Sequence, residues 1–326
     1  MEIGGYIEFE RYHKGMLHEE ALKLNCGRNA LAYLLEAKKI RAIAMPKFMC
    51  DSCDRVLKQY HVSVRYYSIG LDFKLVNFDL LDNEWLYVVN FYGQLSNDYI
   101  QELKNKYDRI IVDEAQAYFQ LPIEGVDTLY TCRKFFGVSD GALLYTDTQL
   151  DRELPQDESF DRMRFLLGRF ERTASEFYSE YVDNNRLFEK EQLKKMSKLT
   201  ENLLRGIDYD MVKNKRKENF LYLHEKLGND NKLALTVPDG AFMYPMYIEN
   251  GDEIRKFLQA EKIYIPTLWP SVFERCDKDE PEYDMARNIL PLPVDQRYDI
   301  DDMKKIVYTL IHREGERLVY GCKEDR

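Results

Sequence analysis

The chain has 326 residues, of which 45% are hydrophobic and 13% aromatic, and a formal net charge of -10. This length suits one large domain or two linked domains with a substantial core. The acidic balance argues against a nucleic-acid-binding protein, which needs a basic face, and no apolar run approaches the ~20 residues of a membrane-spanning helix. The N-terminus lacks the basic and apolar segments of a secretory signal, so the expected location is the cytoplasm.

Strand-like and helical patterns alternate in the first half of the chain. Apolar residues recur at helical spacing in 29–40 and 97–107, with Asn97 as the expected N-cap. Short apolar or alternating runs, typical of strands, occupy 41–46, 62–69, 85–92, 109–116, 128–132 and 141–146. This alternation predicts a three-layer α/β domain with a mostly parallel sheet, in which ligands bind beyond the carboxyl ends of the strands.

The composition changes at about residue 151. Residues 151–227 are rich in charge and have a helical pattern throughout. Strand-like runs return at 241–248 and 262–269, and helical patterns at 252–261 and 299–313. We therefore expect an N-terminal segment and a large α/β domain with a helical bridge over residues 1–205, followed by a smaller α+β domain over 206–326.

Two of the six cysteines, Cys50 and Cys53, form the motif C-x-x-C. Such a pair can bind zinc or act as a redox dithiol. No second C-x-x-C and no histidine pair at ligand spacing accompanies it. The sequence therefore favours small, buried, reduced thiols over a metal or redox site, and it predicts no bound metal.

Three polar side chains follow predicted strands of the first half. Asp113 lies at the polar end of the run 109–116, Gln116 follows three residues later, and Lys134 comes after the next strand-like segment. These residue types suit pyridoxal phosphate. A lysine amine can form a Schiff base with its aldehyde, an aspartate can pair with its protonated pyridine nitrogen, and a glutamine amide can donate to its phenolic oxygen.

The phosphate of such a cofactor requires N–H groups at a helix start. The segment CGRNALAYLL, which begins at Cys26, offers one. Gly27 permits a close approach, and Arg28 can add a charge-assisted hydrogen bond or lie on the surface.

Four segments, in this order, resemble the DegT/DnrJ/EryC1/StrS family, the sugar aminotransferase branch of fold-type I pyridoxal phosphate enzymes. They are LNCGRNALAYLL (24–35), VVNFYGQLSNDYIQELKNKYDRIIVDEAQAYF (88–119), CRKFFGVSDGALLYT (132–146) and ILPLPVDQRYDIDDMKKIVYTL (289–310). The resemblance runs from about residue 20 to about residue 312. It implies a homodimer with sites at the subunit interface.

The resemblance also implies roles for individual residues. Lys134 would form the internal aldimine and move the proton between substrate and cofactor, Asp113 would hold the pyridinium nitrogen, and Gln116 would contact the phenolic oxygen. The residues expected around the phosphate are Gly27, Arg28, Asn29 and Thr131. Phe48 is the candidate for stacking on the ring, although Cys50 takes the position where the family has its aromatic residue.

The implied reaction moves an amino group from an amino acid, plausibly glutamate, to a keto-sugar nucleotide, as in polysaccharide biosynthesis. Two features depart from the family: the loop at Lys134 is short, with Arg133 directly before the lysine, and the segment that reaches the partner subunit has only a loose counterpart in 182–188. Another pyridoxal phosphate reaction and a non-catalytic binding or regulatory relative stay open as alternatives. The joint presence of Asp113, Gln116 and Lys134 favours an enzyme.

Overall fold

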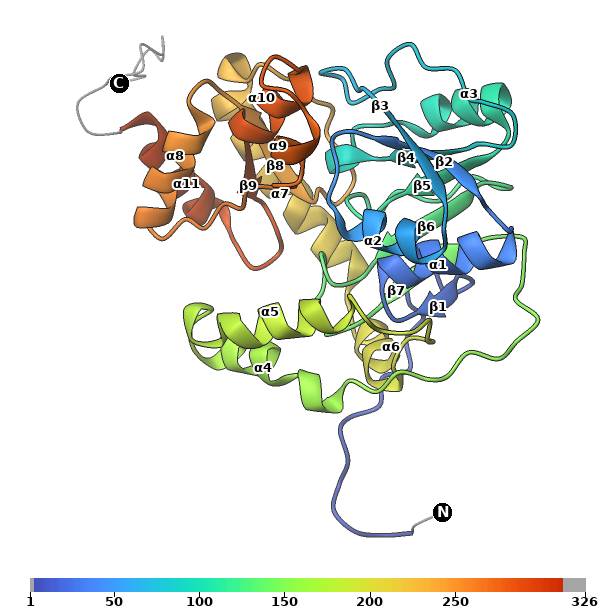
Figure 1. Ribbon diagram of the computed structural model, residues 1–326. Helices are drawn as coiled ribbons and strands as arrows, with labels where there is room; N and C mark the ends of the chain where they lie inside the picture. Colours follow the sequence, from blue (N-terminus) through green and yellow to red (C-terminus); the bar gives the residue numbers. More distant parts are fainter. Residues whose placement is uncertain (1–2, 313–326) are drawn as a thin grey trace.

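The computed structural model describes residues 3–312, and its large domain is built on a seven-stranded sheet (Figure 1). The strands are β1 (Leu22–Leu24), β2 (Ala42–Pro46), β3 (Ser63–Tyr67), β4 (Trp85–Val89), β5 (Ile110–Asp113), β6 (Asp127–Thr131) and β7 (Ala142–Tyr145). Their spatial order is β1-β7-β6-β5-β4-β2-β3. Strands β2 to β6 run parallel to one another, and β7 is antiparallel to both of its neighbours. The sheet is therefore mostly parallel, as predicted.

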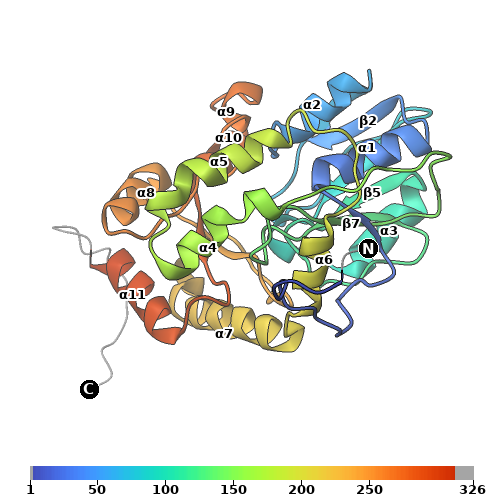
Figure 2. The same cartoon turned by 90° about the horizontal axis from the view of Figure 1, so that it is seen from below.

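Helices cover both faces of this sheet. They are α1 (Gly27–Ala37), α2 (Ser52–Gln59) and α3 (Asn97–Tyr107). Strand β3 lies on one side of β2, whereas β5 lies on the other side of β4, so the two connections run in opposite directions across the sheet. Because both crossovers are right-handed, α2 and α3 lie on opposite faces. Figure 2 shows α1 and α2 on one side of the strands and α3 on the other. These three layers confirm the predicted fold class.

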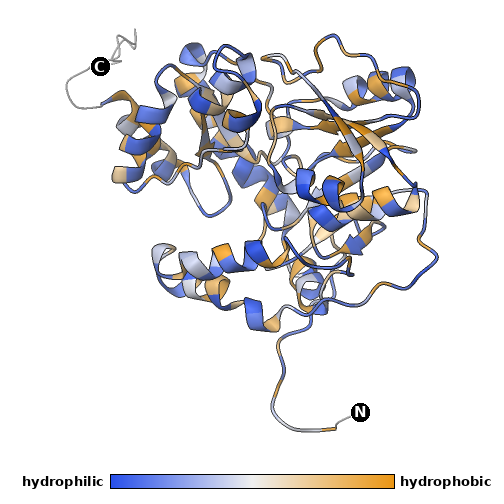
Figure 3. Ribbon diagram, in the orientation of Figure 1, coloured by the Kyte–Doolittle hydropathy of each residue, from blue (hydrophilic) through white to orange (hydrophobic). Residues whose placement is uncertain are grey.

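The core of the large domain comes from strands that are apolar on both faces. In β4 (WLYVV) and β5 (IIVD), only the first residue of β4 and the last of β5 are not fully buried. Figure 3 shows this concentration of apolar residues in the strands. The predicted N-cap of α3 is wrong by one residue. The cap is Ser96, because its hydroxyl accepts a hydrogen bond from the Tyr99 N–H at 3.2 Å.

The second half of the chain is less helical than its sequence predicts. Its helices begin with α4 (Arg164–Glu171), α5 (Tyr178–Leu187), α6 (Lys198–Arg205) and α7 (Tyr209–Leu227). Residues 151–159 and 188–197 are not helical. The second of these segments runs beside β1, where Asn25 N–H donates to the Lys194 carbonyl and Met196 N–H donates to the Lys23 carbonyl, both at 3.1 Å. Backbone pairing along the exposed edge of the sheet therefore outweighs helix propensity there.

A smaller unit packs around the two-stranded antiparallel sheet of β8 (Met243–Tyr247) and β9 (Ile289–Pro293). Its helices are α8 (Gly251–Ala260), α9 (Val272–Arg275), α10 (Pro281–Asn288) and α11 (Ile300–Ile311). A second apolar cluster, which includes Phe220, Leu223, Tyr244 and Leu290, forms the core of this smaller unit. Elsewhere and here, short 3₁₀ turns connect the elements: η1 (Phe91–Gly93), η2 (Phe160–Arg162), η3 (Ser175–Phe177) and η4 (Gly228–Asp230). The domain boundary at residue 206 stays a prediction.

The predicted strand at 262–269 is wrong, because this segment forms no strand and β9 pairs with β8 instead. Pro266 and Pro270 have no N–H to donate to a strand partner, which explains the difference. The end of the predicted helix 299–313 lies outside the described residues. Within residues 3–312, no helix combines the length and the apolar character needed to cross a membrane.

Candidate active site

The predicted site residues gather at the edge of the sheet where the parallel strands end. Strands β2, β4, β5 and β6 all point their carboxyl ends to this edge. The direction in which the sheet grows reverses between β2 and β4, and such a reversal opens a crevice in which α/β proteins bind their ligands.

Asp113 closes β5 with both carboxylate oxygens fixed by hydrogen bonds. The Tyr87 hydroxyl donates to Oδ2 at 2.8 Å, and the Ala115 N–H donates to Oδ1 at 2.8 Å. Burial raises the pKa of Asp113, whereas the positive charge of Lys134 acts to lower it. Asp113 is thus an oriented carboxylate, and a cation beside it stabilises its charged form. Tyr87 supports this arrangement, and sequence reasoning did not identify it because its place on β4 reads as ordinary core.

Lys134 follows β6 and lies within electrostatic range of Asp113. Its side chain is exposed, and Nζ lies 5.5 Å from the centre of the Phe242 ring, next to the smaller unit. No hydrogen bond or ion pair involves its amine within residues 3–312. The structure therefore brings the predicted lysine and aspartate together and leaves the amine accessible.

Gln116 is buried behind the same edge and has a fixed orientation. Its Oε1 accepts a hydrogen bond from the Tyr92 N–H at 2.8 Å. Tyr92 has a φ of 55°, a left-handed conformation that is unusual for tyrosine and that turns this N–H toward the glutamine. Because the oxygen is engaged, the Gln116 amide nitrogen is left as the donor for another group.

The start of α1 lies next to Thr131. A Cβ atom added to Gly27 would lie 4.0 Å from the Thr131 Cβ, so the helix start and the end of β6 adjoin. No side chain caps α1, and its first turn holds no acidic residue. Asn29 uses its side-chain nitrogen within the protein, donating to the Asn25 Oδ1 and the Gln192 carbonyl. Only the backbone N–H of Asn29 can therefore serve an anion here.

Two arginines add positive charge to this helix start. Arg133 donates from Nη1 to the Asn185 Oδ1 at 2.6 Å, and Arg28 donates to the Asn185 carbonyl at 3.3 Å. Burial lowers the pKa of Arg133, and its Nε is buried with no hydrogen-bond partner. Uncapped N–H groups beside a buried, unpaired guanidinium N–H fit the phosphate of the expected cofactor. The position of Arg133 directly before Lys134 was the only sequence signal for it.

Phe48 and Cys50 occupy different surroundings. The Phe48 ring is 1% exposed and packs against Trp269 and Phe91, with ring centres 4.7 Å and 5.4 Å away. Phe48 is therefore part of the main apolar core, and its enclosure argues against the predicted stacking role. Cys50 is half-buried and feels the charge of Lys134, so it is the residue of this segment that faces the site.

Asp140 fixes the turn that follows Lys134. It is fully buried and accepts hydrogen bonds from the Ser197 N–H and hydroxyl, both at 2.7 Å, and from the Thr200 hydroxyl. The next residue must be glycine, because Gly141 has a φ of 116° and an added Cβ would lie 3.1 Å from both the Cys132 Cβ and the Thr200 Cγ2. The start of α6 thus holds the lysine loop in place.

Replacing Asp140 with alanine should destabilise the protein by about 3 kcal/mol or more, because several buried donors lose their charged acceptor. The matched control is Asp147→Ala, whose carboxylate is 78% exposed and pairs with Lys38. That control should change the free energy of unfolding by no more than about 1 kcal/mol. Urea unfolding of both variants measures the difference, and equal effects would contradict the assignment of Asp140 as the anchor.

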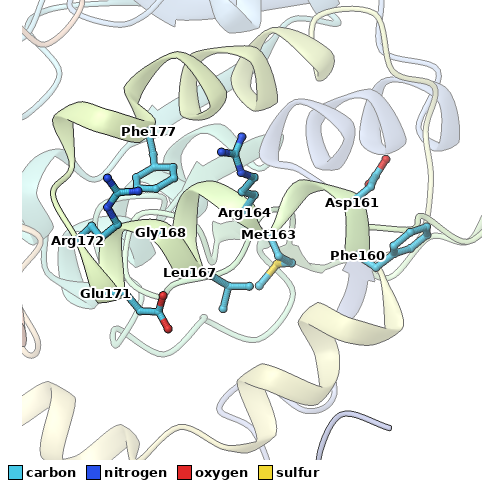
Figure 4. A pocket seen from close by; sticks show the side chains of 9 residues that line it. All are labelled: Phe160, Asp161, Met163, Arg164, Leu167, Gly168, Glu171, Arg172 and Phe177. Atoms are coloured by element: carbon cyan, nitrogen blue, oxygen red, sulfur yellow. The ribbon is translucent and has the colours of Figure 1, made fainter. Parts of the chain in front are cut away.

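A cavity of about 420 Å³ lies apart from this site. It lies over α4 and the turns beside it, and Figure 4 shows the side chains that line it, among them Arg164, Arg172 and Phe177. None of the predicted site residues lines it.

Comparison with known proteins gives matches in structure. No protein-family model and no curated protein matches the chain. DesV from S. venezuelae, solved with a ketimine intermediate, is 18% identical with a TM-score of 0.62, and the match covers 89% of this chain and 83% of DesV. NtdA from Bacillus subtilis with bound cofactor PMP is 13% identical with a TM-score of 0.64, covering 90% of this chain and 72% of NtdA.

A DegT DnrJ EryC1 StrS aminotransferase from Brucella abortus is 16% identical with a TM-score of 0.56, and the match covers 91% of this chain and 86% of that protein. Similarity at this level of identity establishes the fold. The chain therefore has the fold of the aminotransferases that its four sequence segments resemble.

Proposed function

We propose that the chain is a pyridoxal phosphate-dependent aminotransferase. The observation that carries the proposal is the accessible Lys134 amine beside the oriented Asp113 carboxylate, at the edge of the sheet where the parallel strands end. The cofactor would supply an aldehyde that takes up the amino group and a ring that accepts electrons from the breaking bond. The residues present fit each part of such a group.

The ring contacts follow from the hydrogen bonds of the site. Asp113, oriented by Tyr87, would pair with the protonated pyridine nitrogen, and that positive partner would offset the burial of its charge. The Gln116 amide nitrogen would donate to the phenolic oxygen. Lys134 would bind the aldehyde carbon, and its amine, once displaced by the substrate, would take the proton from the substrate carbon.

The phosphate would lie at the start of α1. Gly27 and the backbone N–H of Asn29 would face it from the helix, and the Thr131 hydroxyl from the end of β6. Arg28 and Arg133 would add charge, with the unpaired Nε of Arg133 donating a hydrogen bond.

For substrates, we propose an amino acid, glutamate in the first instance, as donor and a keto-sugar nucleotide as acceptor. The support is the resemblance of the four segments together with structural neighbours described as sugar aminotransferases, such as CalS13 from Micromonospora echinospora, 13% identical with a TM-score of 0.59 over 90% of this chain and 87% of that protein.

A visible absorbance spectrum tests the proposal. Protein purified with pyridoxal phosphate should show the absorbance of a lysine-bound cofactor, and glutamate should bleach it within one turnover. A keto-sugar nucleotide should then restore the band. Cofactor binding without a response to any amino acid would refute transamination and favour another pyridoxal phosphate reaction. No cofactor binding at all would refute the whole proposal.

We further propose that the protein is a homodimer. Large apolar side chains are exposed on α4 and α5, with Phe170 93%, Leu167 60% and Tyr178 64% exposed. Both ribbon views place these two helices side by side, projecting from the large domain (Figures 1 and 2). An apolar surface of this kind is typical of a contact between subunits.

Replacing Phe170 with glutamate should convert the dimer to monomers, because a charge would be buried at the contact. Tyr308→Glu is the matched control, since Tyr308 on α11 is 64% exposed and lies in the smaller unit. Light scattering coupled to size exclusion gives the mass of each. A monomeric unmodified protein, or a dimeric Phe170→Glu variant, would contradict this surface as the contact.

A further inference from the structure

The C-x-x-C pair lies at the candidate site rather than in a remote core. Cys50 directly precedes Asp51, the N-cap of α2, and Cys53 lies in the first turn of that helix. Cys50 is half-buried, whereas Cys53 is only 8% exposed. Cys50 is therefore the less buried of the two residues.

Their contacts make the two thiols chemically different. Cys50 Sγ lies 2.8 Å from the Ser52 hydroxyl oxygen, and Cys53 Sγ lies 4.0 Å from the Tyr87 hydroxyl oxygen. The neighbouring Cys53 thiol lowers the pKa of Cys50 to about 6, helped by Ser52 and the charge of Lys134 and opposed by burial. The Cys50 thiol, together with burial, raises the pKa of Cys53 well above its usual value. Both shifts favour Cys50 as the thiolate and Cys53 as the protonated thiol of the pair.

We propose that Cys50 and Cys53 form a redox-active dithiol that reacts with low-molecular-weight disulfides, with Cys50 as the attacking and Cys53 as the resolving thiol. A half-buried attacking thiol with a more deeply buried partner three residues later, at a helix start, is the arrangement that this exchange requires. The structure thus supports the redox alternative that the sequence did not favour. This inference goes beyond the proposed transamination and does not depend on it.

The exchange balances without any further reagent. The Cys50 thiolate attacks one sulfur of the small disulfide, and a small thiolate leaves. Cys50 is then neutral, which removes the main cause of the raised pKa of Cys53. Cys53 loses its proton to the departing thiolate and attacks the Cys50 sulfur, and the second small thiolate leaves. The protein gives up one proton and two electrons in these steps, and the small disulfide becomes one thiol and one thiolate. The thiolate takes up from solvent the proton that Cys50 had released, so that, counted from the dithiol, two hydrogen atoms are transferred.

Oxidation of Cys50 and Cys53 to a disulfide would affect the candidate cofactor site through Tyr87. The Tyr87 hydroxyl lies next to Cys53 Sγ and also donates to the Asp113 Oδ2. Forming the disulfide moves the Cys53 sulfur toward Cys50 and removes the thiolate that faces Lys134. We therefore expect the environment of Asp113 and Lys134 to change with the redox state; this part rests on the proposed function.

Mass spectrometry of the full-length protein tests the dithiol directly. Trypsin cuts after Lys47 and Arg55, so both cysteines fall in the peptide FMCDSCDR. After equilibration with glutathione and its disulfide, followed by alkylation, the reduced peptide carries two alkyl groups. The oxidised peptide carries none and is lighter by two hydrogen atoms than the free dithiol. The oxidised share should rise with the proportion of glutathione disulfide, while the Cys132 peptide stays alkylated after unfolding.

Cysteine variants and the pH dependence of alkylation show which thiol attacks and which one resolves. Cys53→Ser should accumulate a glutathione adduct on Cys50, because nothing resolves it, and Cys50→Ser should form neither adduct nor disulfide. In native protein, alkylation of Cys50 should have its midpoint near pH 6, the value that its contacts set. The pH midpoint is the better readout than the rate at pH 7, since thiolates of low pKa are also weaker nucleophiles. Cys132→Ser is the control, because burial raises the pKa of that thiol.

A peptide FMCDSCDR that stays doubly alkylated in pure glutathione disulfide would overturn the proposal, as would a Cys53→Ser protein without an adduct. Neither readout needs bound cofactor or activity. A protein that forms the disulfide but binds no pyridoxal phosphate would therefore refute the proposed transamination and keep the dithiol.

Discussion

Replacing Lys134 with alanine should lower the turnover number for transamination by about 10⁴-fold, the upper range of what a positioned acid–base group contributes. The variant should still bind pyridoxal phosphate through Asp113 and the α1 start, but without the absorbance of a lysine-bound cofactor. Stopped-flow absorbance with glutamate measures the loss, and added methylamine should restore part of the rate by replacing the missing amine.

The matched control is Lys304→Ala. Lys304 on α11 is 60% exposed and pairs with Asp301, so its removal should leave turnover unchanged. An Lys134→Ala protein that keeps the lysine-bound absorbance would show that another amine holds the cofactor.

Replacing Asp113 with asparagine should reduce turnover by about 10²- to 10³-fold, as the loss of one oriented electrostatic partner does in other enzymes. Asparagine can keep a hydrogen bond with Tyr87 and the Ala115 N–H, but it has no charge to hold the pyridine nitrogen protonated. Steady-state kinetics with glutamate gives the effect, and Asp98→Asn, on the first turn of α3, is the control.

Although Asp113→Asn should lower turnover, the cofactor-free variant should be at least as stable as the unmodified protein at pH 7. The folded-state pKa of Asp113 is raised by burial, so the ionised carboxylate costs free energy above the unfolded pKa. The contribution of Asp113 to the free energy of unfolding therefore falls as the pH rises from its unfolded-state pKa to its raised folded-state pKa. Asparagine removes that cost, so the variant should melt at the same or a higher temperature at pH 7, and the difference should vanish as the pH falls toward 4. A variant that melts well below the unmodified protein at pH 7 would mean that Asp113 mainly holds the fold together.

The sequence alone determined the fold class, because long apolar strands alternating with amphipathic helices leave few other ways to bury their surface. It also determined which residues follow the strands, and hence that Asp113, Gln116 and Lys134 share one edge. The irregular pairing along β1 and the position of β9 could not be predicted, since they depend on contacts between segments far apart in the chain.

The tertiary structure decided what individual side chains at the site face. Phe48 and Cys50 stand two residues apart in one segment, yet packing against Trp269 encloses the first and leaves the second facing Lys134. Arg133 is a candidate for the proposed anion site because Asn185 and Arg28 lie beside it. A sequence pattern fixes which chemistry is present, whereas burial and neighbouring charges, which come from distant segments, decide which of those groups can act.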